Sequence, residues 1–165
     1  MVSRLMEYDY IIAGSGCAGL SLLHGMLSEK RLRSKKILVI DRDKKQKNDR
    51  TWCFWEKKPG FFEDIVFHSW DNLWVHTNAG SRQLSIAPYV YKLIRGIDFY
   101  QYTDELIDRH PNVERLFGEV EALKSTGLFG IDAETTVLSD EGRCHEPVRS
   151  HHASDLVRDR HHRLQ

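Results

Sequence analysis

The sequence predicts an α/β fold in which a Rossmann-like βαβ unit opens the chain. Three features of the first 41 residues indicate it: an apolar run over residues 8–13, a glycine-rich turn over residues 14–19, and a second apolar run that ends at Asp41. Apolar residues at helical spacing lie between the turn and the second run. In this order of elements, a backbone comes close enough to a dinucleotide to hold its pyrophosphate.

The glycine turn carries the pattern G-x-G-x-x-G and reads Gly14-Ser15-Gly16-Cys17-Ala18-Gly19. Gly14 would allow the tight turn, and Gly16 would leave no side chain between the backbone and the phosphates. Gly19 would let the helix lie close to the strand, and the helix N-terminus would supply N–H groups and a positive dipole end. The pattern alone is weak, but the strand before it and the helix after it supply the required context.

The second apolar run, residues 37–41, has the composition of a buried parallel strand. It ends at Asp41, 22 residues after Gly19, close to the spacing of about 20 residues for the acid that accepts the ribose hydroxyls. A carboxylate at this place repels a 2′-phosphate, which disfavours NADP. NAD and FAD both remain compatible with the glycines and the acid.

Two further segments give the chain a resemblance to a known family. Residues 41–55 contain an Asp-x-Asp element followed by Thr-Trp and aromatic residues, and residues 9–21 contain small residues inside the glycine loop. Together they resemble the bacterial lycopene β-cyclases. Residues 87–100 are similar to the family's next element, an apolar and aromatic segment before a helix. The resemblance covers residues 8–120.

The resemblance implies a flavoprotein of the glutathione-reductase type that binds FAD noncovalently and converts the ends of lycopene, or a related carotene, into β-ionone rings. In that family the reaction is a net isomerisation with reduced flavin, and NAD(P)H supplies the reduction. An acid in a dry apolar pocket would protonate the end group. Because lycopene resides in membranes, peripheral contact with the inner membrane is implied for a cytoplasmic protein.

The predicted cofactor-binding residues comprise the glycine loop, the acid and one further strand residue: Gly14, Ser15, Gly16, Cys17, Ala18, Gly19, Asp41 and Val120. The resemblance implies that the backbone near Val120 covers the adenine, although Val120 could equally be an ordinary strand residue. The family's acidic catalytic motif matches nothing in these 165 residues. No catalytic residue is therefore predicted, and the chain alone is expected to be inactive.

The domain prediction places a partial FAD-binding domain at residues 1–138 and a tail at residues 139–165. The tail holds five of the nine histidines and no aromatic residue besides them, so we expect it to be disordered or translated out of frame. Before it, a helix is predicted over residues 102–110, a third parallel strand over residues 112–120, and a strand pair within residues 128–138.

The histidines and cysteines do not predict a metal site. The six candidate ligands in the tail fit no tetrahedral spacing, and they are Cys144, His145, His151, His152, His161 and His162. Three widely spaced cysteines without a C-x-x-C pair favour a reducing cytoplasm. The sequence contains no apolar run long enough to span a bilayer, and a net charge of zero gives no reason to expect nucleic-acid binding.

The aromatic residues after Asp41 allow two interpretations. In the resembling family they would lie near flavin or substrate, whereas a satellite core under a long loop is favoured for the last two of them; the set is Trp52, Phe54, Trp55, Phe61 and Phe62. Two other functions also stay open. One is a different FAD enzyme, of the hydroxylase or halogenase type. The other is a nicotinamide-binding module or a non-enzymatic interaction fragment.

Overall fold

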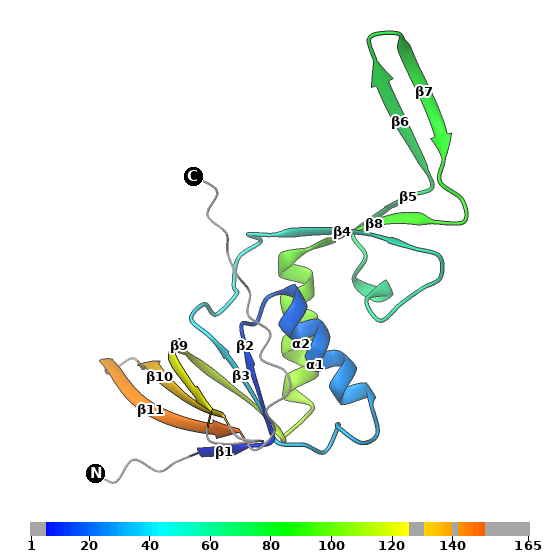
Figure 1. Cartoon of the computed structure of the whole chain (residues 1–165). Coiled ribbons are helices and arrows are strands. Elements are labelled where there is room, and N and C mark those ends of the chain that lie inside the picture. Colours follow the sequence, from blue (N-terminus) through cyan, green and yellow to red (C-terminus); the bar gives the residue numbers. More distant parts are fainter. Residues whose placement is uncertain (1–5, 126–130, 140–141, 151–165) are drawn as a thin grey trace. The chain divides into compact units, whose positions relative to one another are not determined.

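The structure, a computed structural model, describes residues 6–125, 131–139 and 142–150 (Figure 1). The chain divides into two compact units. Unit 1 comprises Met1–Lys44 and Glu105–Gln165, and unit 2 comprises Lys45–Asp104. Helix α2 (Gly96–Asp108) crosses the boundary between their sequences.

Unit 1 is built on a mixed six-stranded sheet in the order β1-β11-β10-β9-β3-β2. Its strands are β1 (Met6–Tyr8), β2 (Tyr10–Ala13), β3 (Ile37–Asp41), β9 (Val113–Ser125), β10 (Ile131–Ser139) and β11 (Gly142–Ser150). Strands β2, β3 and β9 are parallel to one another. Helix α1 (Cys17–Ser28) connects β2 to β3, so the predicted βαβ unit is present.

The sheet of unit 1 is buried on both faces. Ile12 of β2 points toward α1, because a side chain added at Gly19 of that helix would lie 3.1 Å from the Ile12 Cγ2 atom. Residues alternate between the faces of a strand, so Ile11 points the other way. There it belongs to a core cluster with Tyr8, Leu38, Ile40 and Val148. Burial on both faces explains why β3 is apolar along nearly its whole length.

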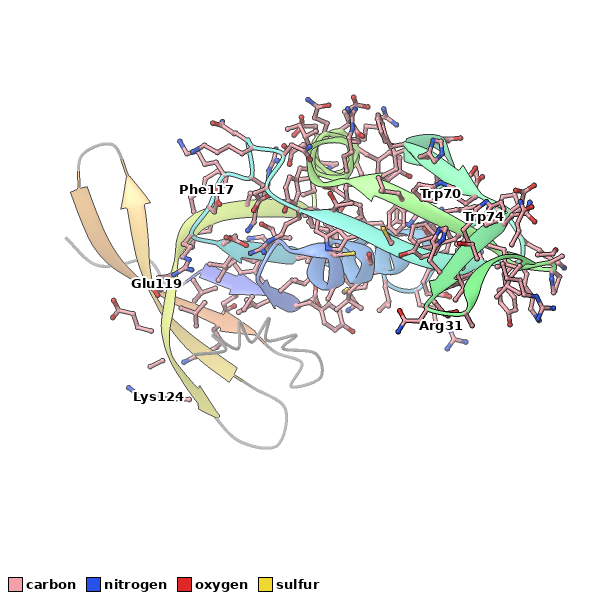
Figure 2. The ribbon with its side chains drawn as sticks, turned by 90° about the horizontal axis from the view of Figure 1, so that it is seen from above. Arg31, Trp70, Trp74, Phe117, Glu119 and Lys124 are labelled. Carbon is pink, nitrogen blue, oxygen red and sulfur yellow. The ribbon has the colours of Figure 1, made fainter. Side chains whose placement is uncertain are left out.

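Strand β9 serves two parts of the sheet. Its first half pairs with β3 in parallel, from Val113 opposite Ile37 to Phe117 opposite Asp41. Its second half pairs with β10 in antiparallel fashion, and a register irregularity lies between Glu134 and Thr135 of β10. Figure 2 labels Phe117, Glu119 and Lys124 along this strand. The predicted third parallel strand is therefore present but extends further than expected.

Strand β11 corrects the predicted domain boundary for residues 142–150. These residues do not form an unstructured tail: they pair with β10 on one edge and with β1 on the other. Pairing on both edges satisfies the backbone, and Val148 is fully buried, so the strand does not need the apolar run that the sequence lacks. Residues 126–130, 140–141 and 151–165 lie outside the described residues, and the expected frame change remains a prediction.

Unit 2 contains a three-stranded antiparallel sheet in the order β4-β8-β5 and a separate hairpin. The sheet strands are β4 (Thr51–Glu56), β5 (His68–Trp70) and β8 (Val90–Arg95), and a 3₁₀ turn (Glu63–Ile65) lies between β4 and β5. The hairpin consists of β6 (Asn72–Thr77) and β7 (Gly80–Ser85). Helix α2 begins six residues before the predicted start at Tyr102, directly after β8.

Candidate functional site

The glycine loop lies at the carboxyl end of β2, between that strand and α1. Gly14 has a φ of 106°, a backbone conformation that residues other than glycine rarely adopt. Its N–H donates a hydrogen bond of 2.7 Å to the carbonyl oxygen of Ile40 on β3. The loop is therefore tied to the end of the neighbouring parallel strand, where Asp41 follows directly.

Gly19 allows the close contact between helix and strand that the sequence predicts. A Cβ atom at this position would lie 2.0 Å from the carbonyl oxygen of Gly14 and would overlap with it. Gly25, six residues further along α1, has nothing within 4 Å of the same hypothetical atom. The requirement for glycine is thus specific to the end of the helix that faces the loop.

The N-terminus of α1 carries no counter-charge of its own. Gly16 is the N-cap residue in an extended conformation, with no side-chain cap hydrogen bond, and the first turn contains no acidic residue. The positive end of the helix dipole and its N–H groups are therefore available to an anion. Cys17 is half-buried and Ala18 is exposed; the Cys17 sulfur lies 4.0 Å from the Ser21 hydroxyl oxygen.

Asp41 lies on the same side as the glycine loop. Its Oδ2 atom accepts hydrogen bonds from the Ser15 N–H at 2.7 Å and from the Ser15 hydroxyl at 2.9 Å. Its Oδ1 atom accepts one from the Asp43 N–H at 2.8 Å. The carboxylate thus joins the loop after β2 to the turn after β3, at the carboxyl ends of two adjacent parallel strands.

Val120 is placed differently from the other predicted site residues. It lies in the antiparallel half of β9, opposite Thr135. Its side chain is partly buried and packs against the core cluster that contains Tyr8 and Val148. This packing accounts for the side chain as an ordinary strand residue, while the predicted role of the backbone stays a prediction.

Two neighbours of the site were not predicted from the sequence. The first is the Asp43 N–H, which donates to the Asp41 carboxylate. Aspartates often form such a turn with the amide two residues later, so the Asp41 in the Asp-x-Asp element could have predicted this contact. The ammonium of Lys44 lies 5.6 Å from the centre of the Phe117 ring. No sequence signal could have found that contact, because it depends on the register of β3 against β9.

Among the described residues, titratable groups outside the loop give no second site. His24 of α1 is buried, and burial lowers the pKa of its imidazole. No three potential metal ligands gather within the described ranges. The four histidines of the predicted tail beyond residue 150 lie outside them. Neither α1 nor α2 is long and apolar enough to cross a bilayer, nor is any other helix in the part of the chain that the structure describes.

The aromatic residues of unit 2 separate into two groups. Trp52 and Phe62 pack edge-to-face on Phe99 of α2, with ring centres 5.0 and 5.1 Å away. The satellite-core prediction therefore holds for Phe62. It does not hold for Phe61, which is 63% exposed, because the chain at the 3₁₀ turn directs only one of the two neighbouring rings inward.

A second aromatic group crosses one face of the β4-β8-β5 sheet. Tyr91 of β8 is in register with Trp55 of β4 and Trp70 of β5. The ring centres lie 4.6 Å apart for Trp55 and Tyr91, and 5.7 Å apart for Trp70 and Tyr91. Figure 2 labels Trp70, and it labels Trp74 on the neighbouring hairpin.

Solved structures similar to this chain include two monooxygenases and a flavin-dependent brominase. The p-nitrophenol 4-monooxygenase PnpA from Pseudomonas putida DLL-E4 aligns over 90% of this chain and 40% of its own, with a TM-score of 0.64 and 13% identity. The flavin-dependent brominase Bmp2 aligns over 88% and 36%, with a TM-score of 0.64 and 19% identity. PqsL, a probable FAD-dependent monooxygenase from Pseudomonas aeruginosa, aligns over 87% and 40%, with a TM-score of 0.59 and 18% identity.

These likenesses establish the fold, and the prediction of an α/β domain of the Rossmann-like, FAD-binding type is confirmed in its fold class. The chain spans about two-fifths of the length of these enzymes. A search of curated protein sequences finds no significant match. The model of one protein family, described as lycopene cyclase protein, matches residues 9–151.

Proposed function

The chain belongs to the lycopene cyclase family, and from this we propose that it binds FAD as the dinucleotide-binding part of a cyclase that forms β-ionone rings. The observation that carries the proposal is the 2.7 Å hydrogen bond between the Ser15 N–H and Asp41. It places a carboxylate that can accept the ribose hydroxyls beside the uncapped N-terminus of α1, at the carboxyl ends of the parallel strands. That is where dinucleotides bind in folds of this class.

The residues at this edge fit an adenine dinucleotide. Gly16 offers backbone without a side chain, and the first turn of α1 adds no negative charge that would oppose a diphosphate. The Asp41 carboxylate can accept ribose hydroxyls but would repel a 2′-phosphate. The site therefore suits FAD or NAD better than NADP, and family membership favours FAD.

In this proposal the chain supplies binding and orientation. The loop amides would hold the diphosphate, Asp41 the ribose, and the backbone near Val120 the adenine. Bound in reduced form, the flavin would act without net redox turnover, with NAD(P)H as its reductant. The ring closure is an isomerisation, so one proton enters the carotene and another leaves. We assign no catalytic residue to this chain, and we expect no cyclisation by it alone.

The exposed aromatic residues of unit 2 support a second proposal, which concerns contact with a membrane. Trp55, Trp74 and Tyr89 are exposed there, and the Lys57 ammonium lies 4.9 Å from the centre of the Tyr89 ring. Tryptophan, tyrosine and lysine together are typical of surfaces that contact lipid headgroups. We propose that unit 2 makes peripheral contact with the membrane that carries the carotene.

Cofactor binding can be tested by calorimetric titration of the purified chain with FAD, NAD and NADP. We expect FAD to bind most tightly. Asp41→Ala should weaken FAD binding at least about tenfold, because a hydrogen-bonded charged group contributes about 1.5–3 kcal/mol. Asp43→Ala is the matched control, because it removes a neighbouring carboxylate but keeps the backbone N–H that donates to Asp41.

Each other outcome has a definite meaning. Preference for NAD over FAD would support the nicotinamide-binding alternative and count against the cyclase assignment. Absence of any dinucleotide binding by a folded chain would refute the proposal. The hydroxylase or halogenase alternative shares the FAD prediction, and it requires hydroxylation or halogenation of an aromatic substrate by a protein that contains this chain.

A further inference from the structure

Ser15 makes a double contact with Asp41 inside the glycine loop. Its N–H and its hydroxyl both donate to the same oxygen, Oδ2 of Asp41, at 2.7 and 2.9 Å. The other oxygen, Oδ1, is held at 2.8 Å by the Asp43 N–H from the turn after β3. The pattern G-x-G-x-x-G requires only glycines, so it leaves the residue at position 15 unspecified.

The three donors together fix the orientation of the carboxylate. The last side-chain torsion of an aspartate has a broad energy profile, so a carboxylate held by one donor can rotate. Here donors from two different loops hold both oxygens, and the Ser15 hydroxyl adds a second bond to Oδ2. An ionised carboxylate has about four acceptor positions, so it can be held by several donors at once.

We propose that Ser15 is a positioning residue that sets the Asp41 carboxylate for ribose recognition and thereby determines discrimination against a 2′-phosphate. The inference rests on the proposed function, because it assumes that a dinucleotide binds at this loop. A fixed carboxylate keeps its negative charge beside the ribose, where it accepts hydroxyl groups and repels a phosphate. A carboxylate that can turn away loses part of both effects.

The hydroxyl is the separable part of this arrangement. Ser15→Ala removes it but keeps the amide hydrogen bond to Asp41. Ser15→Thr keeps the hydroxyl. The backbone at this position can hold a β-branched residue, because Ser15 is not among the described residues that have a positive φ. The matched control is Ser28→Ala at the other end of α1, where the hydroxyl donates to the His24 carbonyl oxygen at 2.8 Å.

The test is calorimetric titration of the full chain and its variants with ADP-ribose and with its 2′-phosphorylated form, together with thermal denaturation without ligand. We expect the wild-type chain to prefer ADP-ribose. Ser15→Ala should weaken ADP-ribose binding severalfold, because the Asp41 carboxylate is then held by two donors in place of three and can turn away from the ribose. It should also reduce the preference over the phosphorylated ligand severalfold. Ser15→Thr should restore both, and Ser28→Ala should change neither.

The ratio of the affinities for ADP-ribose and its 2′-phosphorylated form distinguishes a positioning role of Ser15 from a purely structural one. If Ser15→Ala weakens both ligands by the same factor, or lowers only the melting temperature, Ser15 has no positioning role. Tighter ADP-ribose binding by Ser15→Ala would also overturn the inference, because it would mean that the hydroxyl competes with the ribose. A wild-type chain that binds FAD but neither of these ligands would overturn the inference alone, whereas a folded chain that binds no dinucleotide would refute the proposed function and the inference with it.

Discussion

The two units differ in how far their large apolar side chains are buried. In unit 1, such residues fill the core around Tyr8, Ile11 and Val148. In unit 2, several of them are exposed, and among the side chains that the structure describes every exposed large apolar residue belongs to this unit: Trp55, Phe61, Phe67, Trp74, Val75, Leu84 and Tyr89. Large exposed apolar surface is typical of regions that contact something else.

The two units therefore meet different demands within one chain. Unit 1 needs close packing, because a loop that binds through backbone amides must be held by a rigid sheet and helix. Unit 2 holds its own core with the rings of Trp52, Phe62 and Phe99 and leaves another aromatic face open. Substitutions should therefore affect the folding of unit 1 strongly, and should often affect contacts rather than folding in unit 2.

The largest effect is expected at Gly19 in unit 1. Gly19→Ala places a methyl group 2.0 Å from the Gly14 carbonyl oxygen, so helix and loop must move apart. We expect a loss of about 3 kcal/mol or more in the free energy of unfolding, together with loss of FAD binding. Gly25→Ala on the same helix meets nothing within 4 Å and should stabilise by about 0.5–1 kcal/mol. Thermal denaturation of the pair measures the difference, and equal behaviour would contradict close packing at Gly19.

In unit 2 the strongest effect on folding should come from Lys92, whose side chain is 6% exposed. Its ammonium lies 2.9 Å from a Glu56 oxygen and also pairs with Glu63. Burial alone would lower the pKa of Lys92, but the hydrogen bonds to Glu63 and Glu56 more than reverse this and raise it. The lysine is therefore charged, and it fastens the segment after β4 to the sheet.

Lys92→Met would leave two carboxylates facing each other without a counter-charge. Removing one partner of a buried ion pair costs about 3–5 kcal/mol. We expect about 2 kcal/mol here, because both glutamates are partly exposed. Arg109→Met, which breaks an exposed pair with Glu105, should cost less than about 0.5 kcal/mol. Urea denaturation of both variants tests this, and an equal loss in both would argue against the buried lysine as an anchor.

A smaller effect is expected from His24 in unit 1. Burial lowers the pKa of its imidazole below the ordinary value of 6.5, so the unfolded chain takes up a proton at higher pH than the folded chain. The stability is therefore fully present above about pH 6.5 and is lost as the pH falls toward the lowered pKa. His24→Gln should flatten this part of the pH profile. Because the two proteins differ only at residue 24, the difference between their melting temperatures from pH 7.5 to 5 isolates His24, and parallel profiles would rule it out.

Much of unit 1 could be predicted from the sequence, because its signals are local. The glycine loop, the apolar run before Asp41 and their spacing sufficed to place the acid beside the loop. Strand β11 was missed because its burial depends on pairing with β1, which is distant in the chain, as well as with the preceding strand β10. The double contact of Ser15 was missed for a similar reason, since a serine inside a glycine loop gives no signal until the end of β3 is placed beside it.

We expect the smallest effect on folding at Trp74. This residue also tests the contrast between the two units most directly. It is 59% exposed on the β6–β7 hairpin, and its ring stacks on His76 at 6.2 Å between centres. Trp74→Ser should change stability by no more than about 0.5 kcal/mol but should reduce cosedimentation with anionic phospholipid vesicles severalfold. Gln83→Ser, directly across the hairpin, is the matched control and should leave vesicle binding intact. If Trp74→Ser binds vesicles as well as the wild-type chain does, the exposed hairpin does not contact the membrane. If it unfolds the chain, Trp74 contributes to packing, and the contrast between the two units is weaker than proposed.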